Sequence, residues 1–140
     1  MTMWTQVAHT MKNLLPKEAQ AWLQTHPHAL FLDVRMEIES MYVGRPPGVV
    51  NVPWYDYPDL QPDAERFAAA VAQEATGKDQ PLLLICRSGQ RTIAAGQTLE
   101  SAGFTDVQHV VHGFEGDLDE HFKRSTLSGW RFDELPWEQM

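Results

Sequence analysis

The stretch that decides the fold is PLLLICRSGQRTIAAGQTLESAGF, residues 81–104. It begins with a continuous apolar run, which is the pattern of a central parallel strand buried on both faces. After a short polar loop the spacing becomes helical, because Ala95, Leu99 and Ala102 fall on one face of a helix. Gly103 suits the position just after the last turn. A strand that leads directly into a helix predicts an α/β fold.

The same alternation extends through the rest of the chain. Apolar runs predict three further strands, in segments 28–35 (ending near Asp33), 49–52 and 106–113. Helical spacing predicts a helix that starts at Pro16, a short helix in 36–42 and a helix from about Pro62 to Ala75. Strands and helices that alternate in this way predict a mainly parallel central sheet flanked by helices on both faces.

Length and composition indicate one globular domain. The chain has 140 residues, of which 43% are hydrophobic and 21% are charged. We predict a single domain over residues 1–140, with a core of about 16–116 and a C-terminal tail of 117–140. We expect the tail to form a short helix and then an extended segment, pinned to the body by Trp130 and Trp137.

The charge and the cysteine count exclude several classes of function. The net charge of −8 argues against nucleic acid or an anionic membrane as a general partner. The N-terminus has no signal-peptide pattern and no apolar run is long enough to span a bilayer, so we expect a soluble, cytoplasmic protein. One cysteine, Cys86, allows neither an intramolecular disulfide nor a cysteine-rich zinc site.

The loop after the apolar strand is the strongest candidate for a functional site. In open α/β sheets, ligands bind beyond the carboxyl ends of the strands, which is where Cys86 falls. The helix that follows would offer unpaired amides and partial positive charge to an anion. Arg87 and Arg91 are unfavourable beside a helix N-terminus unless an anion sits there, and the same field favours a thiolate. Gly89 suits a tight loop. Taken alone, a lone cysteine at the end of an apolar run is more often a buried structural thiol, and the neighbouring loop favours the functional interpretation of Cys86.

These residues resemble the signature of the rhodanese family, Cys-x-x-Gly-x-Arg followed by Ser or Thr. The signature reads here Cys86-Arg87-Ser88-Gly89-Gln90-Arg91-Thr92. Two further blocks match the family in order and spacing. They are Asp33-Val34-Arg35 followed by an acidic stretch and RPPGVVNVP, and HVVHGFEG at residues 109–116. The resemblance runs from about Pro16 to Gly116.

The resemblance implies a mainly parallel sheet flanked by helices and sulfur transfer through a persulfide on Cys86. It implies a small anionic donor such as thiosulfate and, as acceptor, a thiol, cyanide or a protein, with no cofactor. Arg87 and Arg91 would bind the sulfonate end of the donor, or Arg91 would instead brace the loop. Ser88 and Thr92 would add hydroxyl donors.

Three residues outside the loop are candidates for a supporting role. Asp33 and Arg35 are interpreted as a strand-end pair that positions loops near the site rather than as catalytic groups. Arg45 stands where the family usually has histidine. It could extend the positive rim of the site or pair with a carboxylate such as Glu37 or Glu39.

The histidines do not form a metal-binding pattern. His109 and His112 straddle the end of a predicted strand, so their side chains should diverge, and no cysteine or carboxylate spacing completes a site. We interpret His109, His112 and His121 as loop and surface residues, and we predict no metal.

Two other functions remain open at this point. Cysteine phosphatases and arsenate reductases of related shape also place a cysteine and an arginine on an anion-binding loop. Their loop has five residues between the two, whereas four lie between Cys86 and Arg91. A non-catalytic binding module is the other alternative, although such modules usually lose the cysteine or the loop arginine.

Overall fold

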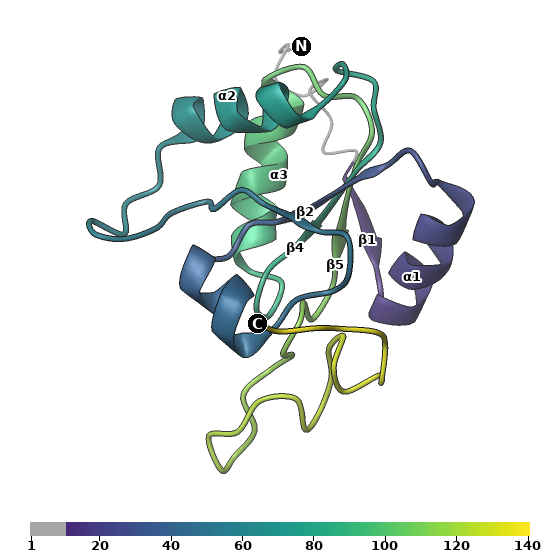
Figure 1. The fold of residues 1–140 in the computed structure, drawn as a ribbon, viewed down its shortest axis with the longest axis vertical. Coiled ribbons are helices and arrows are strands. Elements are labelled where there is room, and N and C mark those ends of the chain that lie inside the picture. The colour runs from purple at the N-terminus through teal and green to yellow at the C-terminus, as the bar shows by residue number, and fades with distance from the viewer. Residues whose placement is uncertain (1–10) are drawn as a thin grey trace, which may run out of the picture.

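The computed structural model of the protein describes residues 11–140. Its centre is a five-stranded sheet in which every neighbouring pair of strands is parallel (Figure 1). The strand order is β1 (Lys12–Leu14), β5 (Val107–Val110), β4 (Leu82–Ile85), β2 (Leu30–Asp33) and β3 (Val50–Asn51). The α/β fold predicted from the sequence is therefore confirmed. Because all strands run the same way, their carboxyl ends meet at one edge.

Helices cover both faces of the sheet. Helix α1 (Pro16–Thr25) lies on one face, and α2 (Ala64–Glu74) and α3 (Arg91–Ser101) lie on the other (Figure 1). Helix α2 starts later than the predicted Pro62, because the Asp63 side chain accepts the backbone N–H of Arg66 at 3.1 Å and so caps the helix.

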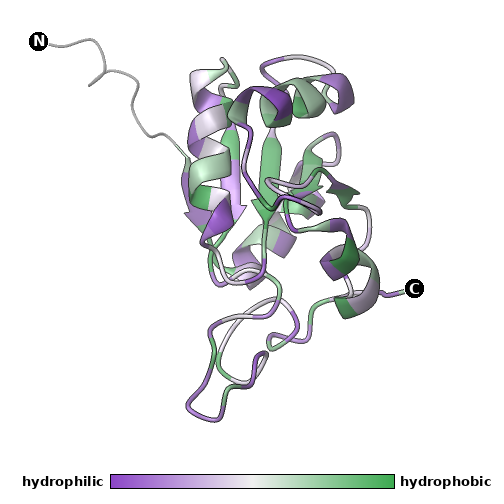
Figure 2. Ribbon diagram, turned by 90° about the vertical axis from the view of Figure 1, so that its left-hand side faces the viewer, coloured by the Kyte–Doolittle hydropathy of each residue, from purple (hydrophilic) through white to green (hydrophobic). Residues whose placement is uncertain are grey.

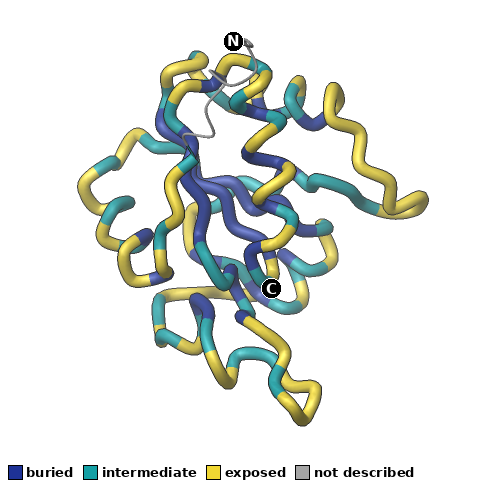
Figure 3. Tube along the Cα trace, turned by 180° about the vertical axis from the view of Figure 1, so that it is seen from behind, coloured by how far each residue is buried: buried dark blue, intermediate teal, exposed yellow. Residues whose placement is uncertain are grey.

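Strand β4 links the two halves of the core. Leu82 and Leu84 pack on the α2–α3 side with Val71 and Leu99. Leu83 and Ile85 face the other side, where Phe31 and Trp130 lie. All four β4 residues are fully buried, and the central strands lie in the enclosed interior of Figure 3, where Figure 2 shows apolar residues. A one-residue slip of β4 would exchange these two sets, so the core fixes its register.

The C-terminal segment differs from the prediction, because residues 117–140 contain no helix. The Asp119 carboxylate accepts the backbone N–H groups of His121 and Lys123 and the hydroxyl of Thr126, which closes a local loop in place of a helical turn. Farther along, the chain returns to the body, and Arg45 and Glu138 form an isolated antiparallel bridge.

Both tryptophans of this segment contact the body. The Trp130 side chain is 1% exposed, its ring centroid lies 5.8 Å from that of Phe31, and its indole N–H donates to the Pro136 carbonyl at 2.7 Å. Trp137 is more exposed and meets the Phe114 ring edge-on at 6.0 Å. The segment thus completes the core on the α1 side of the sheet.

Two smaller elements differ from their predicted form, and a third was not predicted. The helix expected in 36–42 includes a π-helical turn, η2 (Glu39–Val43), and the strand expected in 49–52 is limited to Val50–Asn51. Strand β1 was not predicted, since Lys12–Leu14 is too short and too polar to show an apolar run. Within residues 11–140, none of the helices is both long enough and apolar enough to cross a bilayer.

Replacing Trp130 tests how much the C-terminal segment contributes to stability. We expect Trp130→Ala to lower the free energy of unfolding by roughly 3–5 kcal/mol, because it empties a fully buried site. Phe122→Ala is the matched control, since that ring is 81% exposed and its loss should have little effect. Urea denaturation measures both, and equal effects of the two variants would contradict the assignment.

Candidate active site

Cys86 continues the alternation of strand β4. It follows Leu82 and Leu84 on the same side of the sheet and belongs to the same cluster, at the carboxyl edge below the start of α3. The residue is 1% exposed. Burial alone would suit a structural thiol, so the polar groups around the sulfur decide what the site can do.

The peptides after Cys86 are oriented by the segment that follows β5. The Cys86 carbonyl accepts the N–H of Phe114 at 2.8 Å, and the Arg87 carbonyl accepts the N–H of Glu115 at 2.9 Å. In a trans peptide the C=O and N–H point in opposite directions. The N–H groups of Arg87 and Ser88 therefore point away from segment 114–116.

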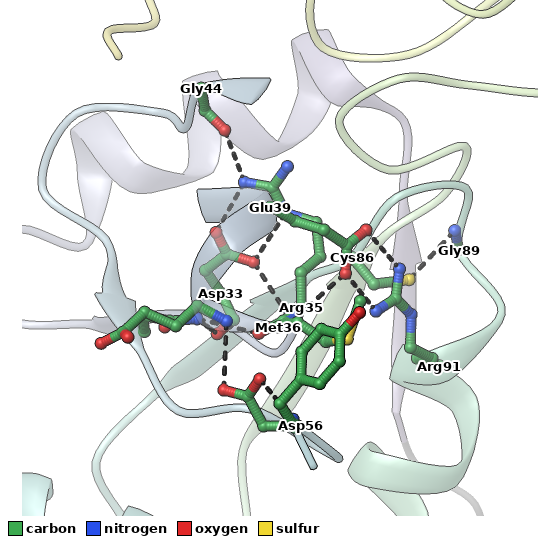
Figure 4. A network of polar contacts seen from close by, with 12 residues as sticks. Asp33, Arg35, Met36, Glu39, Gly44, Asp56, Cys86, Gly89 and Arg91 are labelled. Atoms are coloured by element: carbon green, nitrogen blue, oxygen red, sulfur yellow. Dashed lines mark hydrogen bonds and ion pairs between the residues drawn. The ribbon is translucent and has the colours of Figure 1, made fainter. Parts of the chain in front are cut away.

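The next amide reaches the sulfur itself. The Gly89 N–H donates to the Cys86 Sγ at 3.1 Å (Figure 4). Gly89 has a φ of +96°, which favours glycine. An amide directed at a sulfur makes the surroundings locally positive without a metal, and this suits a thiolate or another sulfur anion.

Glycine is also required at position 113. Gly113 has a φ of +63°, and a Cβ there would collide with the Cys86 carbonyl oxygen and lie 2.7 Å from the Arg87 carbonyl carbon. The close approach of these two backbones explains why segment 114–116 can hold the loop. The turn HGFEG, known from the sequence only as a family block, thus serves to set the loop conformation.

Arg91 braces the loop from its far end. Its Nη1 and Nη2 donate to the two carboxylate oxygens of Glu39 at 2.7 and 2.9 Å (Figure 4). Its guanidinium lies 5.3 Å from the centre of the Tyr55 ring. The two charged side chains are 13% and 12% exposed. Burial raises the pKa of Glu39, but the hydrogen bonds and charge of Arg91 outweigh it and the pKa is lowered. Burial likewise lowers the pKa of Arg91, and Glu39 outweighs this and raises it.

The other loop side chains are more accessible. Arg87 is exposed, and with the other residues in 11–140 its side chain forms no hydrogen bond or ion pair. Ser88 is half-buried, and Gln90 is exposed directly before α3. Arg87 is therefore the loop arginine that is free to meet an incoming anion, while Arg91 is held by Glu39.

The supporting residues lie outside the loop. Arg35 is fully buried and donates to both carboxylate oxygens of Asp33, at 2.9 and 2.7 Å, and to the Gly44 carbonyl. This pair fixes the chain between β2 and η2, which carries Glu39. Arg45 pairs with Glu138 at 3.2 Å rather than with either carboxylate named from the sequence.

The histidine interpretation is wrong for His109. Its ring lies in β5 and is 5% exposed, not on a loop or the surface. Its Nδ1 lies 2.7 Å from the Thr92 Oγ1, and its Nε2 lies 2.7 Å from the Asn13 Oδ1. Thr92 Oγ1 in turn is 3.7 Å from the Cys86 Sγ. This contact was missed because Asn13 belongs to the unpredicted strand β1.

Comparisons with known proteins agree with this geometry. Residues 15–120 match the family model described as a rhodanese-like domain. The chain is similar to the crystal structure of Rv0390 from M. tuberculosis, with 34% sequence identity and a TM-score of 0.80. The match covers 92% of this chain and 98% of the Rv0390 chain. The mouse thiosulfate sulfurtransferase/rhodanese-like domain-containing protein 3 is 28% identical, over 76% of this chain and 68% of its own. The polysulfide-sulfur transferase homodimer of Wolinella succinogenes is 20% identical with a TM-score of 0.63, over 97% and 84% of the two chains.

Exchanging the partners of the Arg91–Glu39 pair separates two roles of Arg91, which are to brace the loop and to place a positive charge near the Cys86 thiol. We expect Arg91→Glu alone to lower the free energy of unfolding by roughly 3 kcal/mol, because it leaves two carboxylates together where a pair was buried. Adding Glu39→Arg should restore most of that stability but place an anion in the position beside the thiol. Alkylation of Cys86 should then stay slower than in the wild type. Wild-type alkylation in the double variant would show that Arg91 acts only as a brace.

Lowering the pH should weaken the Arg91–Glu39 pair, because Glu39 becomes protonated. Because the pKa of Glu39 is lowered on folding, its stabilisation is complete above its ordinary value of 4.5 and is lost as pH falls through the folded value. We expect the unfolding free energies of wild type and Glu39→Gln to differ near neutral pH and to converge in acid. Urea denaturation over a pH series measures this, and a pH-independent difference would contradict it.

Proposed function

Because this chain belongs to the rhodanese-like domain family, we propose that it is a sulfurtransferase that carries sulfane sulfur as a persulfide on Cys86. The observation that carries the proposal is the Gly89 N–H directed at the Cys86 sulfur at 3.1 Å, within a loop whose peptides are turned by segment 114–116. A buried structural thiol needs no such donor, whereas a sulfur anion does.

The proposed reaction has two displacement steps. The Cys86 thiolate attacks the outer sulfur of a donor such as thiosulfate, a new S–S bond forms, and the bond to the sulfonate breaks so that sulfite leaves with the electron pair. An acceptor thiolate or cyanide then attacks the terminal sulfur of the persulfide, and Cys86 leaves as a thiolate. Both intermediates on Cys86 are anionic, so the same amides stabilise them throughout.

The two loop arginines would have different roles in the reaction. Arg87, exposed at the edge of the loop, would bind the sulfonate end of the donor. Arg91 would hold the loop in shape through Glu39 and contribute its charge near the sulfur. The name of the mouse relative, which includes thiosulfate sulfurtransferase, supports a donor of this class. The natural donor, the acceptor (thiol, cyanide or protein) and the cytoplasmic location stay predictions.

The same contacts favour sulfur transfer over phosphoester hydrolysis. A phosphatase loop uses its arginine to hold the phosphate oxygens, and here Nη1 and Nη2 of Arg91 both donate to Glu39. The four-residue spacing between Cys86 and Arg91 also leaves a smaller cradle than the five-residue loop of phosphatases. A single extra sulfur suits it better than a tetrahedral phosphate.

Intact mass spectrometry after incubation with thiosulfate tests the proposal directly. We expect the wild type to gain the mass of one sulfur atom and to lose it again when cyanide is added. Cys86→Ala should gain nothing, and it is the matched control because the chain has no other cysteine.

An aryl phosphate assay run beside it distinguishes the alternatives. Efficient phosphate hydrolysis without sulfur loading would overturn the proposal in favour of a phosphatase. Neither activity, with a biological function that survives Cys86→Ser, would favour a binding module.

A further inference from the structure

A chain of four side chains, three of them buried, leads from the reactive sulfur to the exposed Asn13 on the edge strand β1. Thr92 Oγ1 lies 3.7 Å from Cys86 Sγ and 2.7 Å from His109 Nδ1, and His109 Nε2 lies 2.7 Å from Asn13 Oδ1. Cys86, Thr92 and His109 are at most 5% exposed. The chain draws on four elements, since Asn13 is on β1, His109 on β5 and Thr92 on α3, and Cys86 follows β4.

The contacts assign hydrogen-bond directions along this chain. Asn13 Oδ1 can only accept, so His109 Nε2 carries a proton and, in the neutral ring, Nδ1 is an acceptor. Thr92 then donates to His109, over 2.7 Å, in preference to the Gly89 carbonyl at 3.3 Å. The Thr92 oxygen then accepts a hydrogen bond from the Cys86 thiol, over 3.7 Å.

We propose that Thr92, His109 and Asn13 form a relay that removes the proton from the Cys86 thiol and so prepares the nucleophile. The biological role of the relay rests on the proposed function, but its test does not, because alkylation of Cys86 is measured without a sulfur donor. Thr92 touches the reacting sulfur, whereas His109 and Asn13 are positioning residues that act through it.

The proton transfer balances within the chain. The S–H bond of Cys86 breaks as its proton passes to Thr92 Oγ1, while the original hydroxyl proton of Thr92 passes to His109 Nδ1. The products are a thiolate and an imidazolium, and no oxidant or reductant is needed. His109 then donates to Thr92 and to Asn13, and Thr92 donates to the sulfur. The thiolate thereby gains a second donor beside the Gly89 N–H.

The surroundings of His109 suit this role. Burial lowers the pKa of His109, so the ring is in its neutral, proton-accepting form at neutral pH. The ring and Asn13 also line a cavity of about 580 Å³, which gives the proton a route to solvent. The titratable groups on this cavity are Glu100 of α3 and the loop residues His112 and Asp117, which approach each other at 3.9 Å.

The pH dependence of Cys86 alkylation by iodoacetamide tests the relay. The single cysteine makes the reaction report on this sulfur alone, and no sulfur donor is present. We expect the alkylation rate of the wild type, plotted against pH, to stay high in a region that extends below neutral pH, which we call the reactive limb. Thr92→Val and His109→Gln should remove that limb and lower the rate near neutral pH by roughly tenfold to hundredfold. Thr92→Ser, which keeps the hydroxyl, should keep the limb.

Asn13→Asp provides a second test at an exposed position that does not disturb the core. A carboxylate beside Nε2 stabilises the imidazolium, so the limb should move to lower pH. A wild-type profile in folded His109→Gln, or no displacement in folded Asn13→Asp, overturns the relay. The expected profiles without persulfide formation would leave the relay standing and reject the proposed function.

Discussion

The conformation of the loop after β4 depends on two backbone hydrogen bonds. The carbonyls of Cys86 and Arg87 accept the N–H groups of Phe114 and Glu115. The N–H groups of the same two peptides, which belong to Arg87 and Ser88, therefore point away from segment 114–116. Gly113 permits this contact because its missing side chain lets the two backbones meet. The orientation of these two peptides is therefore a property of main-chain geometry, and it is set by a turn that follows a different strand.

Three constraints converge on the same sulfur. The register of β4 places Cys86 above Leu84 on the α2–α3 side, segment 114–116 turns the first half of the loop, and the Arg91–Glu39 pair fixes the second half. The pair also engages the guanidinium of Arg91, which is therefore not free to bind a ligand as Arg87 is. Because the Arg91–Glu39 pair lies within the protein, it holds the loop rigid without a bound ligand. Rigidity of this kind reduces the reorganisation needed as charge moves onto sulfur.

The sequence was sufficient for four of the five strands, for the three main helices and for the loop after β4. Those elements carry long apolar periodicities, and PLLLIC followed by helical spacing is unambiguous. It was insufficient where a partner comes from far along the chain. Glu39 looked like a possible partner of Arg45, yet it pairs with Arg91, 52 positions away. His109 looked like a surface residue because β1, which supplies Asn13, is three residues long and mostly exposed. The sequence of the tail predicts a short helix, but in the structure the side-chain contacts of Asp119 replace helical hydrogen bonds.

A crystal structure of the thiosulfate-treated protein, with the anomalous signal of sulfur, tests the central claim most directly. The account predicts one additional sulfur bonded to Cys86 Sγ, within hydrogen-bonding distance of the loop amides, with Glu39 still bound to Arg91. It would be contradicted if Cys86 stayed unmodified while the loop amides turned away from the sulfur.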